Sequence, residues 1–411
     1  MTSAPMSNPG TSRNTDIEVL RAAAIAFTLC SHLVWGLLPK IGEAGRRLQS
    51  MFHFWTGVDL FFGISGFVIT SSLIKVLEEE DSGRAALGAK GAREFFQMAV
   101  PFWIRRVFRL LPSAWLWILI TLILAAGFNF HASFGPLRDN LHEAGAAGLN
   151  IANFYYYEWF AGNNSAYGSL GVYWSLSLEE QFYLLLPFLL FFSGRRTLIA
   201  VLAAAFFAQV FLARPDGFIP HHTSFLWFVR TDAIILGVLI AFWRRRPSYR
   251  LVEPRFLRRS ALSLPLVGLC LALLAALPAL QGSIPFSTGL CAIVSGLLVL
   301  IASYDRNYIL QPSAFKTAMV WLGSRSYSIY LIHVTCHALV MEFKRSAGIA
   351  EGGIVSELLT LASLLLILVV AEMNYRLIEV PFRRMGRRMA DGFGARQKYA
   401  GAIEDAPAVA R

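Results

Sequence analysis

Two residues that could do chemistry lie in one apolar segment, 16–38, which is long enough to cross a bilayer. They are Arg21, near its beginning, and His32, deep inside it, with ten residues between them. On a helix they would lie roughly 16 Å apart along the axis. An ionisable side chain inside a membrane span is costly to place and is a functional candidate by default. Because an imidazole accepts protons near neutral pH, His32 is the first candidate for a general base.

Other polar side chains fall at a similar depth in other apolar segments. We measure depth by counting residues from the predicted cytoplasmic end of each span and using the rise of an α-helix. The residues at about the depth of His32 are Asp59, Glu179, Glu180, Arg230, Asp232 and His333. An acid–base site inside a helix bundle would explain all of them together. Glu179 and Glu180 lie about 100° apart on a helix, so only one of the two is expected to face the interior.

Each of these residues also has a purely structural explanation. A histidine in a span can be a hydrogen-bonded packing residue, as His32 or His333 would then be. Arg230 and Asp232 could form a buried ion pair that only fixes helix packing. Asp59 could brace the close helix contact that the glycines following it permit.

A second group of arginines lies near the predicted cytoplasmic ends of the spans. It comprises Arg21, Arg105, Arg106, Arg109 and Arg376. Guanidinium forks match phosphate oxygens, so the group could hold a phosphorylated donor. Arginines that flank spans are also the ordinary positive-inside signal, and this alternative stays open.

The composition is that of an integral membrane protein. Of 411 residues, 56% are hydrophobic and 15% charged, whereas soluble proteins have about 25% charged residues. The net charge of +11 comes mostly from short loops between apolar runs. We interpret that charge as a topology signal, and we expect no nucleic-acid partner.

The apolar runs predict an all-α polytopic bundle of about ten transmembrane helices. The predicted spans are 17–39, 51–74, 107–128, 171–192, 197–212, 226–243, 262–279, 286–304, 318–342 and 355–377. Lys and Arg gather in alternate connecting segments, which places both termini in the cytoplasm. Residues 1–15 are expected to be a disordered lead, 16–385 the transmembrane domain, and 386–411 a basic, flexible tail. The four cysteines lack metal-ligand spacing, and we expect neither a disulfide nor a metal.

Several motifs resemble acyltransferase family 3, a family of membrane proteins that includes bacterial glycan O-acetyltransferases. They are D-I-E-V-L-R-A-A-A-I with the later His32, G-V-D-L-F-F-G-I-S-G-F-V-I-T at 57–70, R-V-F-R at 106–109, Y-W-S-L-S-L-E-E-Q-F-Y-L-L-L-P at 173–187, R-T-D-A-I-I-L-G at 230–237, G-S-R-S-Y-S-I-Y-L-I-H at 323–333 and Y-R-L-I-E-V-P-F-R at 375–383. They stand in the family's order along nearly the whole chain. The chain departs from common family residues at Val19 and Gly63, neither of which touches the expected chemistry.

The resemblance implies ten helices, an acyl-CoA donor (usually acetyl-CoA) and a hydroxyl acceptor on a glycan or a glycosylated molecule. It assigns the chemistry to His32, Asp59 and the acidic pair Glu179 and Glu180, with Glu180 favoured, and donor binding to Arg21, Arg106 and Arg109. We include the neighbouring Arg105 among the candidates for donor binding because of its place in the arginine group. Candidates for substrate binding are Trp174, Ser177, Arg230, Asp232, Tyr330 and His333. The chain ends soon after its tenth predicted span, so we expect the form of the family without a C-terminal esterase-like domain.

The expected protein is therefore a multi-pass O-acyltransferase of the bacterial cytoplasmic (inner) membrane. Its partners would be the acceptor glycan, membrane lipid and other proteins of glycan biosynthesis. His32 would act either as the general base or as a nucleophile that carries the acyl group itself. The alternative function is a proton-coupled secondary transporter that uses the same intramembrane residues as a proton relay. Transporters often show internal repeats, and none is visible in this sequence.

Overall fold

The computed structural model describes residues 13–34, 42–79, 89–162, 164, 168–214, 223–350 and 353–404. Every regular element among these residues is helical, which confirms the all-α prediction. The α-helices are α1 (Thr15–Leu29), α2 (Glu43–Met51), α3 (Gly57–Glu79), α4 (Ala89–Gly127), α5 (Leu137–Gly148), α6 (Ala152–Ala161), α7 (Tyr173–Phe192), α8 (Arg195–Val210), α9 (Phe225–Phe228), α10 (Asp232–Trp243), α11 (Pro247–Leu251), α12 (Ser260–Ala276), α13 (Ser287–Ser303), α14 (Ala314–Ser324), α15 (Ser326–Ser346), α16 (Ile354–Asn374) and α17 (Val380–Glu404). Short 3₁₀ or π segments are η1 (Cys30–Val34), η3 (Phe54–Thr56), η4 (Arg255–Arg258), η5 (Leu277–Leu280) and η6 (Tyr375–Glu379).

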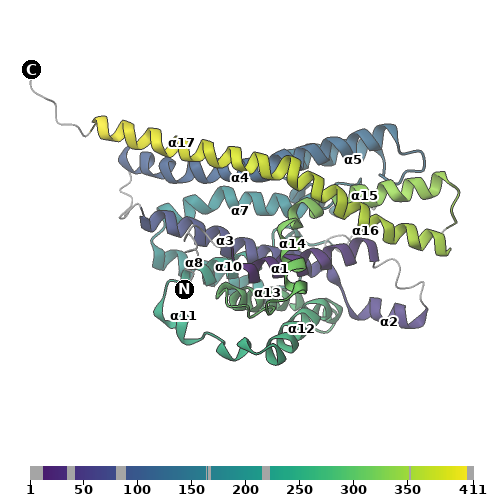
Figure 1. The fold of residues 1–411 in the computed structure, drawn as a ribbon, viewed down its shortest axis with the longest axis horizontal. Helices are drawn as coiled ribbons and strands as arrows, with labels where there is room; N and C mark the ends of the chain where they lie inside the picture. Colours follow the sequence, from purple (N-terminus) through teal and green to yellow (C-terminus); the bar gives the residue numbers. More distant parts are fainter. Residues whose placement is uncertain are drawn as a thin grey trace, which may run out of the picture.

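Most of the long helices lie roughly along one common axis, as Figure 1 shows for α3, α4, α7, α16 and α17. Five helical stretches in the described part of the chain are long and apolar enough to cross a membrane: Glu43–Val76, Gly91–Gly127, Tyr173–Phe192, Ala261–Leu280 and Ile354–Phe393. Two shorter apolar helices are Asp232–Trp243 and Ser287–Ser303. Each of the ten predicted spans overlaps a helix. The count of ten and the orientation of the termini stay predictions.

Helix α4 is longer than the span predicted at 107–128, because it begins at Ala89. Its first part buries Phe95, Met98 and Ala99 in an apolar cluster with Phe191 of α7. This one-sided apolar face supports a helix although its other face is too polar for a hydropathy search to find it. As a result, the arginines at 105, 106 and 109 lie inside a continuous helix and do not open one.

The span predicted at 318–342 is divided between two helices, with Arg325 at the break between α14 and α15. The Arg325 guanidinium forms an ion pair with Glu372 at 2.8 Å and lies over the rings of Trp321 and Tyr375. The prediction of one continuous span at 318–342 was wrong. The apolar run continues through Arg325, so hydropathy does not reveal the break between the two helices.

The two predicted ends of the chain are only partly described. Of the disordered lead expected at 1–15, residues 1–12 lie outside the described residues. Asn14 caps α1, because its side chain accepts a hydrogen bond from the backbone N–H of Ile17. Helix α17 continues to Glu404, through much of the stretch expected to be a tail. It lies beside α4 along the upper edge of Figure 1. Gly386 of α17 packs closely against Phe108 of α4.

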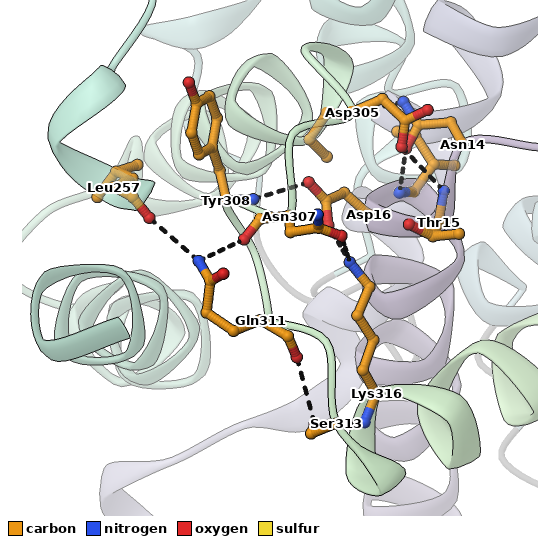
Figure 2. A network of polar contacts seen from close by, with 12 residues as sticks. Asn14, Thr15, Asp16, Leu257, Asp305, Asn307, Tyr308, Gln311, Ser313 and Lys316 are labelled. Atoms are coloured by element: carbon orange, nitrogen blue, oxygen red, sulfur yellow. Dashed lines mark hydrogen bonds and ion pairs between the residues drawn. The ribbon is translucent and has the colours of Figure 1, made fainter. Parts of the chain in front are cut away.

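The N-terminus of α1 is anchored by a buried polar network (Figure 2). The Asp16 carboxylate accepts from the Lys316 ammonium at 2.8 Å and from the backbone N–H of Tyr308 at 2.9 Å. Lys316 also donates to the Asn307 side chain at 2.7 Å. The backbone N–H of Thr15 donates to Asp305 at 3.1 Å. These contacts join α1 to the segment between α13 and α14, and they fix the helix that carries Arg21 and leads into His32.

Helices α3 and α10 approach each other closely through two glycines. A Cβ added to Gly66 would lie 2.1 Å from the carbonyl oxygen of Ile234, and one added to Gly237 would lie 2.2 Å from that of Gly63. No side chain fits at such distances, so glycine is required at both contacts. This contact sets the first turn of α3 beside the residues that precede α10.

Candidate active site

Two cavities among the described residues contain most of the predicted site. The histidine cavity has a volume of about 480 Å³, and its wall includes His32, His53, Trp55, Trp174, Trp227 and Arg230. The arginine cavity is much smaller, about 70 Å³, and its wall includes Arg21, Ser65, Arg106, Arg109, Ser175, Glu179, Tyr183 and Tyr327. Val58 and Tyr330 line both cavities and therefore stand between them. We call this pair the neck.

His32 lies in η1, a short π-helical segment that continues α1, and is exposed into the histidine cavity. Such single π turns inside α-helices often occur at functional positions. The His32 ring meets the edge of the His333 ring, with centroids 4.9 Å apart and an interplanar angle of 89°. The structure thus brings together two histidines that lie far apart in the sequence.

His333 has a defined tautomer because of its backbone contact. It is fully buried, and its Nδ1 lies 2.7 Å from the carbonyl oxygen of Tyr330. A carbonyl only accepts, so Nδ1 carries the hydrogen and Nε2 keeps its lone pair. Within the described part of the chain, Nε2 has no hydrogen-bond partner. His333 is therefore able to accept a hydrogen bond beside His32.

The carboxylates predicted to orient His32 lie elsewhere in the structure. Asp59 accepts from Arg230 Nε at 2.9 Å in a fully buried ion pair. Glu179 lines the arginine cavity, whereas Glu180 lines neither cavity. Among the described residues, no carboxylate forms a hydrogen bond with His32. The contact between His32 and His333 was not predicted, because spacing in the sequence does not show which helices lie side by side.

The arginine cavity gathers three of the five arginines singled out in the sequence. Arg21, Arg106 and Arg109 line it, and the Arg106 guanidinium lies over the Tyr183 ring at 5.5 Å. Arg106 Nε and Arg109 Nε are buried and have no hydrogen-bond partner in the described structure. The other two turn elsewhere: Arg105 pairs with Asp391 at 3.6 Å, and the exposed Arg376 with Glu372.

Glu179 is the member of the acidic pair that lines the arginine cavity. It accepts from the Ser65 hydroxyl of α3 and from the Tyr183 hydroxyl one turn along α7. Sequence analysis had favoured Glu180 for the site, but Glu179 is the member of the pair that lines the cavity. Helical geometry could show that the two residues point apart, but it could not show which of them lines the cavity.

The residues predicted to bind substrate fall into two sets. Trp174, Arg230 and Tyr330 line the histidine cavity, and His333 contacts His32. Ser177 instead accepts from the backbone N–H of Ala152 at 3.1 Å, on the side facing α6. Asp232 pairs with the buried Arg214 at 2.6 Å, and neither residue lines either cavity.

Several site residues were missed by sequence analysis. They are Ser65, Ser175, Tyr183 and Tyr327 in the arginine cavity and His53, Trp55 and Trp227 in the histidine cavity. Ser175 and Tyr330 share a hydrogen bond of 2.6 Å between their hydroxyls, which holds the Tyr330 side of the neck. Ser175 lies two residues before the predicted Ser177, and periodicity alone does not distinguish the two faces of an apolar helix.

A loop that lines the histidine cavity is held from behind by α5. The Glu143 carboxylate accepts from the backbone N–H of Gly168 at 2.6 Å and of Leu170 at 3.0 Å. The Asn140 amide oxygen accepts from the backbone N–H of Ser169 at 2.9 Å. Burial raises the pKa of Glu143 to about 7, an effect that these backbone hydrogen bonds oppose.

No cluster of three His, Cys, Asp or Glu residues that could hold a metal ion occurs among the described residues. The four cysteines are free thiols. The histidine cavity presents an imidazole, and the arginine cavity presents guanidinium groups.

The chain matches the acyltransferase domain family over residues 14–372. It is 30% identical over 400 residues to the peptidoglycan O-acetyltransferase OatA of Listeria monocytogenes, covering 90% of this chain and 56% of that protein. It is 28% identical over 352 residues to the O-acetyltransferase OatA of Staphylococcus aureus strain NCTC 8325, covering 80% of this chain and 53% of the relative. The chain therefore spans about half the length of the curated relatives it matches. No solved structure matches significantly. The extent of the family match means that the chain belongs to acyltransferase family 3.

Proposed function

We propose that this protein is an O-acyltransferase that moves an acyl group, in the first instance acetyl, from acyl-CoA to a hydroxyl of a glycan or glycosylated acceptor. The observation that carries the proposal is the pair of cavities that meet at Val58 and Tyr330. One cavity presents cations for an anionic donor, and the other presents an imidazole and aromatic walls for an acceptor. Such an arrangement separates the two substrates and lets them meet at one point.

The donor would bind at the arginine cavity. Arg106 and Arg109 offer buried, unpartnered N–H groups, and Arg21 lines the same wall. These groups suit the phosphates of CoA, because guanidinium–phosphate hydrogen bonds are charge-assisted and directional. The thioester end would extend through the neck toward His32, which follows Arg21 along the same helix.

In the proposed reaction His32 acts as the general base. It takes the proton of the acceptor hydroxyl while that oxygen attacks the thioester carbonyl. The carbon–sulfur bond then breaks, and the imidazolium gives its proton to the departing thiolate, so that an ester and free CoA are formed. His333 takes the place usually held by a carboxylate beside a catalytic histidine. Its Nε2 can accept a hydrogen bond from an N–H of His32 and so fix the tautomer of His32.

The alternative route has His32 carry the acyl group as a covalent intermediate. Alternate-substrate kinetics distinguish the two routes, since a covalent intermediate gives ping-pong behaviour. The names of the relatives support a glycan as the acceptor, because one of them is a peptidoglycan O-acetyltransferase. We propose the bacterial inner membrane as the location, with proteins of glycan biosynthesis as partners.

The proposal is tested with purified protein in nanodiscs, by following the release of CoA from acetyl-CoA with a panel of glycans. We expect His32→Ala to reduce turnover by at least about 100-fold while CoA binding is retained. The Arg106→Ala/Arg109→Ala variant should instead lose CoA binding. Matched controls are His142→Ala and Arg384→Ala/Arg388→Ala, which change exposed residues outside both cavities.

Turnover of His32→Ala at the wild-type rate would contradict the proposal. Proton-coupled uptake by wild-type protein in liposomes, without release of CoA, would support the transporter alternative instead.

A further inference from the structure

Arg230 is the one guanidinium that lines the histidine cavity among the residues described there. It is 1% exposed, and it is held in place on several sides. Its Nε donates to Asp59, and its guanidinium carbon lies 4.0 Å from the Trp227 ring, 4.9 Å from Trp55 and 5.0 Å from Trp174. The side chain therefore has a fixed position before any substrate arrives.

The two terminal nitrogens of this guanidinium are not used by the protein. Arg230 Nη1 and Nη2 are buried and have no hydrogen-bond partner in the described structure. Buried donors without partners are rare, because each loses its hydrogen bonds to water. In a wall of the cavity that contains His32, they point to an acceptor oxygen that belongs to a bound molecule.

The charges around Arg230 decide which kind of oxygen it would bind. Asp59 already neutralises Arg230, and the neighbouring Arg214–Asp232 pair is neutral as well. Asp59 and Asp232 lie in the first turns of α3 and α10, where the helix dipoles stabilise their charges. A permanently anionic acceptor would thus leave an unbalanced charge in the cavity. A transient oxyanion would not, because it forms together with the imidazolium of His32.

We propose that Arg230 binds the acyl carbonyl oxygen and stabilises the oxyanion that forms there during transfer. This inference rests on the proposed function. As the acceptor oxygen bonds to the carbonyl carbon, the carbonyl π electrons move onto the oxygen that Nη1 and Nη2 face. They return when the carbon–sulfur bond breaks and the thiolate leaves with the proton from His32. Fixed donors are effective here because they need no reorganisation.

The test compares Arg230→Lys with Arg214→Lys, using purified protein with acetyl-CoA and an active glycan acceptor. Both changes keep a cation beside a buried aspartate, but only Arg230 lines the cavity. We expect Arg230→Lys to lower kcat by about 100- to 1,000-fold with little change in the KM of either substrate. Arg214→Lys should retain kcat within about threefold. CoA binding and thermal unfolding are measured for both variants.

A second variant keeps the test decisive if Arg230→Lys fails to fold. Arg230→Gln/Asp59→Asn removes both charges, so that no unpaired buried charge remains. It should bind CoA normally and show the same loss of kcat. A folded variant that retains kcat would overturn the inference, as would a rise in acceptor KM with kcat unchanged. Absence of transfer by the wild-type protein would instead refute the proposed function itself.

Discussion

Glu143 shapes the histidine cavity although it does not line it. Its two carboxylate oxygens hold the backbone at Gly168 and Leu170, and Gly168 and Ser169 form part of the cavity wall. A carboxyl group that accepts backbone hydrogen bonds can order a loop that has no regular structure of its own. The position of that wall therefore depends on a buried group whose protonation changes near neutral pH.

This group predicts a pH dependence of stability. The pKa of Glu143 is about 7 in the folded protein, above its ordinary value of 4.5. Folding therefore favours the protonated form, so this contribution to stability is complete below about pH 4.5 and is lost as the pH rises through about 7. We expect the Tm of the detergent-solubilised protein to fall over this range by more than that of Glu143→Gln. Glu158→Gln, at an exposed position on α6, is the control. Parallel Tm curves for wild type and Glu143→Gln would contradict the assignment.

The sequence identifies individual site residues better than it identifies their partners. His32, Arg106, Arg109 and Arg230 are visible because a charge or an imidazole in an apolar run is unusual. Their contacts depend on how separate helices turn toward one another, which one helix does not encode. The ion pair suggested between Arg230 and its near neighbour Asp232 is wrong, because the structure pairs Arg230 with Asp59 and Asp232 with Arg214.

Helix α3 can place Asp59 beside Arg230 only because it approaches α10 without intervening side chains. The contact at Gly66 and Gly237 leaves no room for a Cβ. The glycines that follow Asp59, of which Gly66 is one, were expected to permit a close contact, whereas the matching Gly237 was not identified. Small residues indicate a close helix contact, but they do not name the helix on the other side.

This contact predicts the effect of one added methyl group. Gly66→Ala places a Cβ against the carbonyl of Ile234, which must push α3 and α10 apart. We expect a loss of about 1–3 kcal/mol in the free energy of unfolding and a lower kcat, since Asp59 and Arg230 separate. Gly268→Ala in α12 is the control, because its added Cβ would meet nothing within 4 Å. Equal unfolding of the two variants in a denaturant titration would refute the close contact.

The elements themselves were predictable where hydropathy and helix length agree. Helix α7 begins and ends within two residues of its predicted span, because its apolar run is bounded by polar loops. The early start of α4, the break at Arg325 and the π turn at His32 were not predictable in this way. Each of them depends on contacts between helices, and hydropathy averaged along a segment does not contain that information.

At the scale of the whole molecule, segments predicted to share one side of the membrane contact one another. The residues before α1 bond to the end of α13, and Tyr308 donates to Glu253 at 2.7 Å. Among the segments predicted to lie on the opposite side, the backbone N–H groups of His131 and Ser133 donate to Glu342. Two separate groups of loops are what the arginine and lysine distribution predicts.

The orientation can be tested with one introduced cysteine at a time in a Cys30→Ser background, in which the three remaining cysteines are buried. Ser346→Cys, at the end of α15, should react with a membrane-impermeant maleimide on intact spheroplasts. Ser248→Cys, in α11, should react only after the membrane is opened, because its segment carries the basic residues retained in the cytoplasm. Both serines are exposed, so accessibility within the protein is matched. The reverse pattern of labelling would show that the predicted orientation is inverted.

The neck at Val58 and Tyr330 has a consequence for membrane energetics. Under the proposed mechanism, one acyl group passes the neck in one direction while the proton taken up by His32 leaves in the other, as part of the thiol of CoA. The acyl group and the proton exchange places between the acceptor oxygen and the CoA sulfur. A full turnover therefore carries no net charge between the two cavities. The transfer would then draw only on the free energy of the thioester and would leave the electrical potential across the membrane untouched.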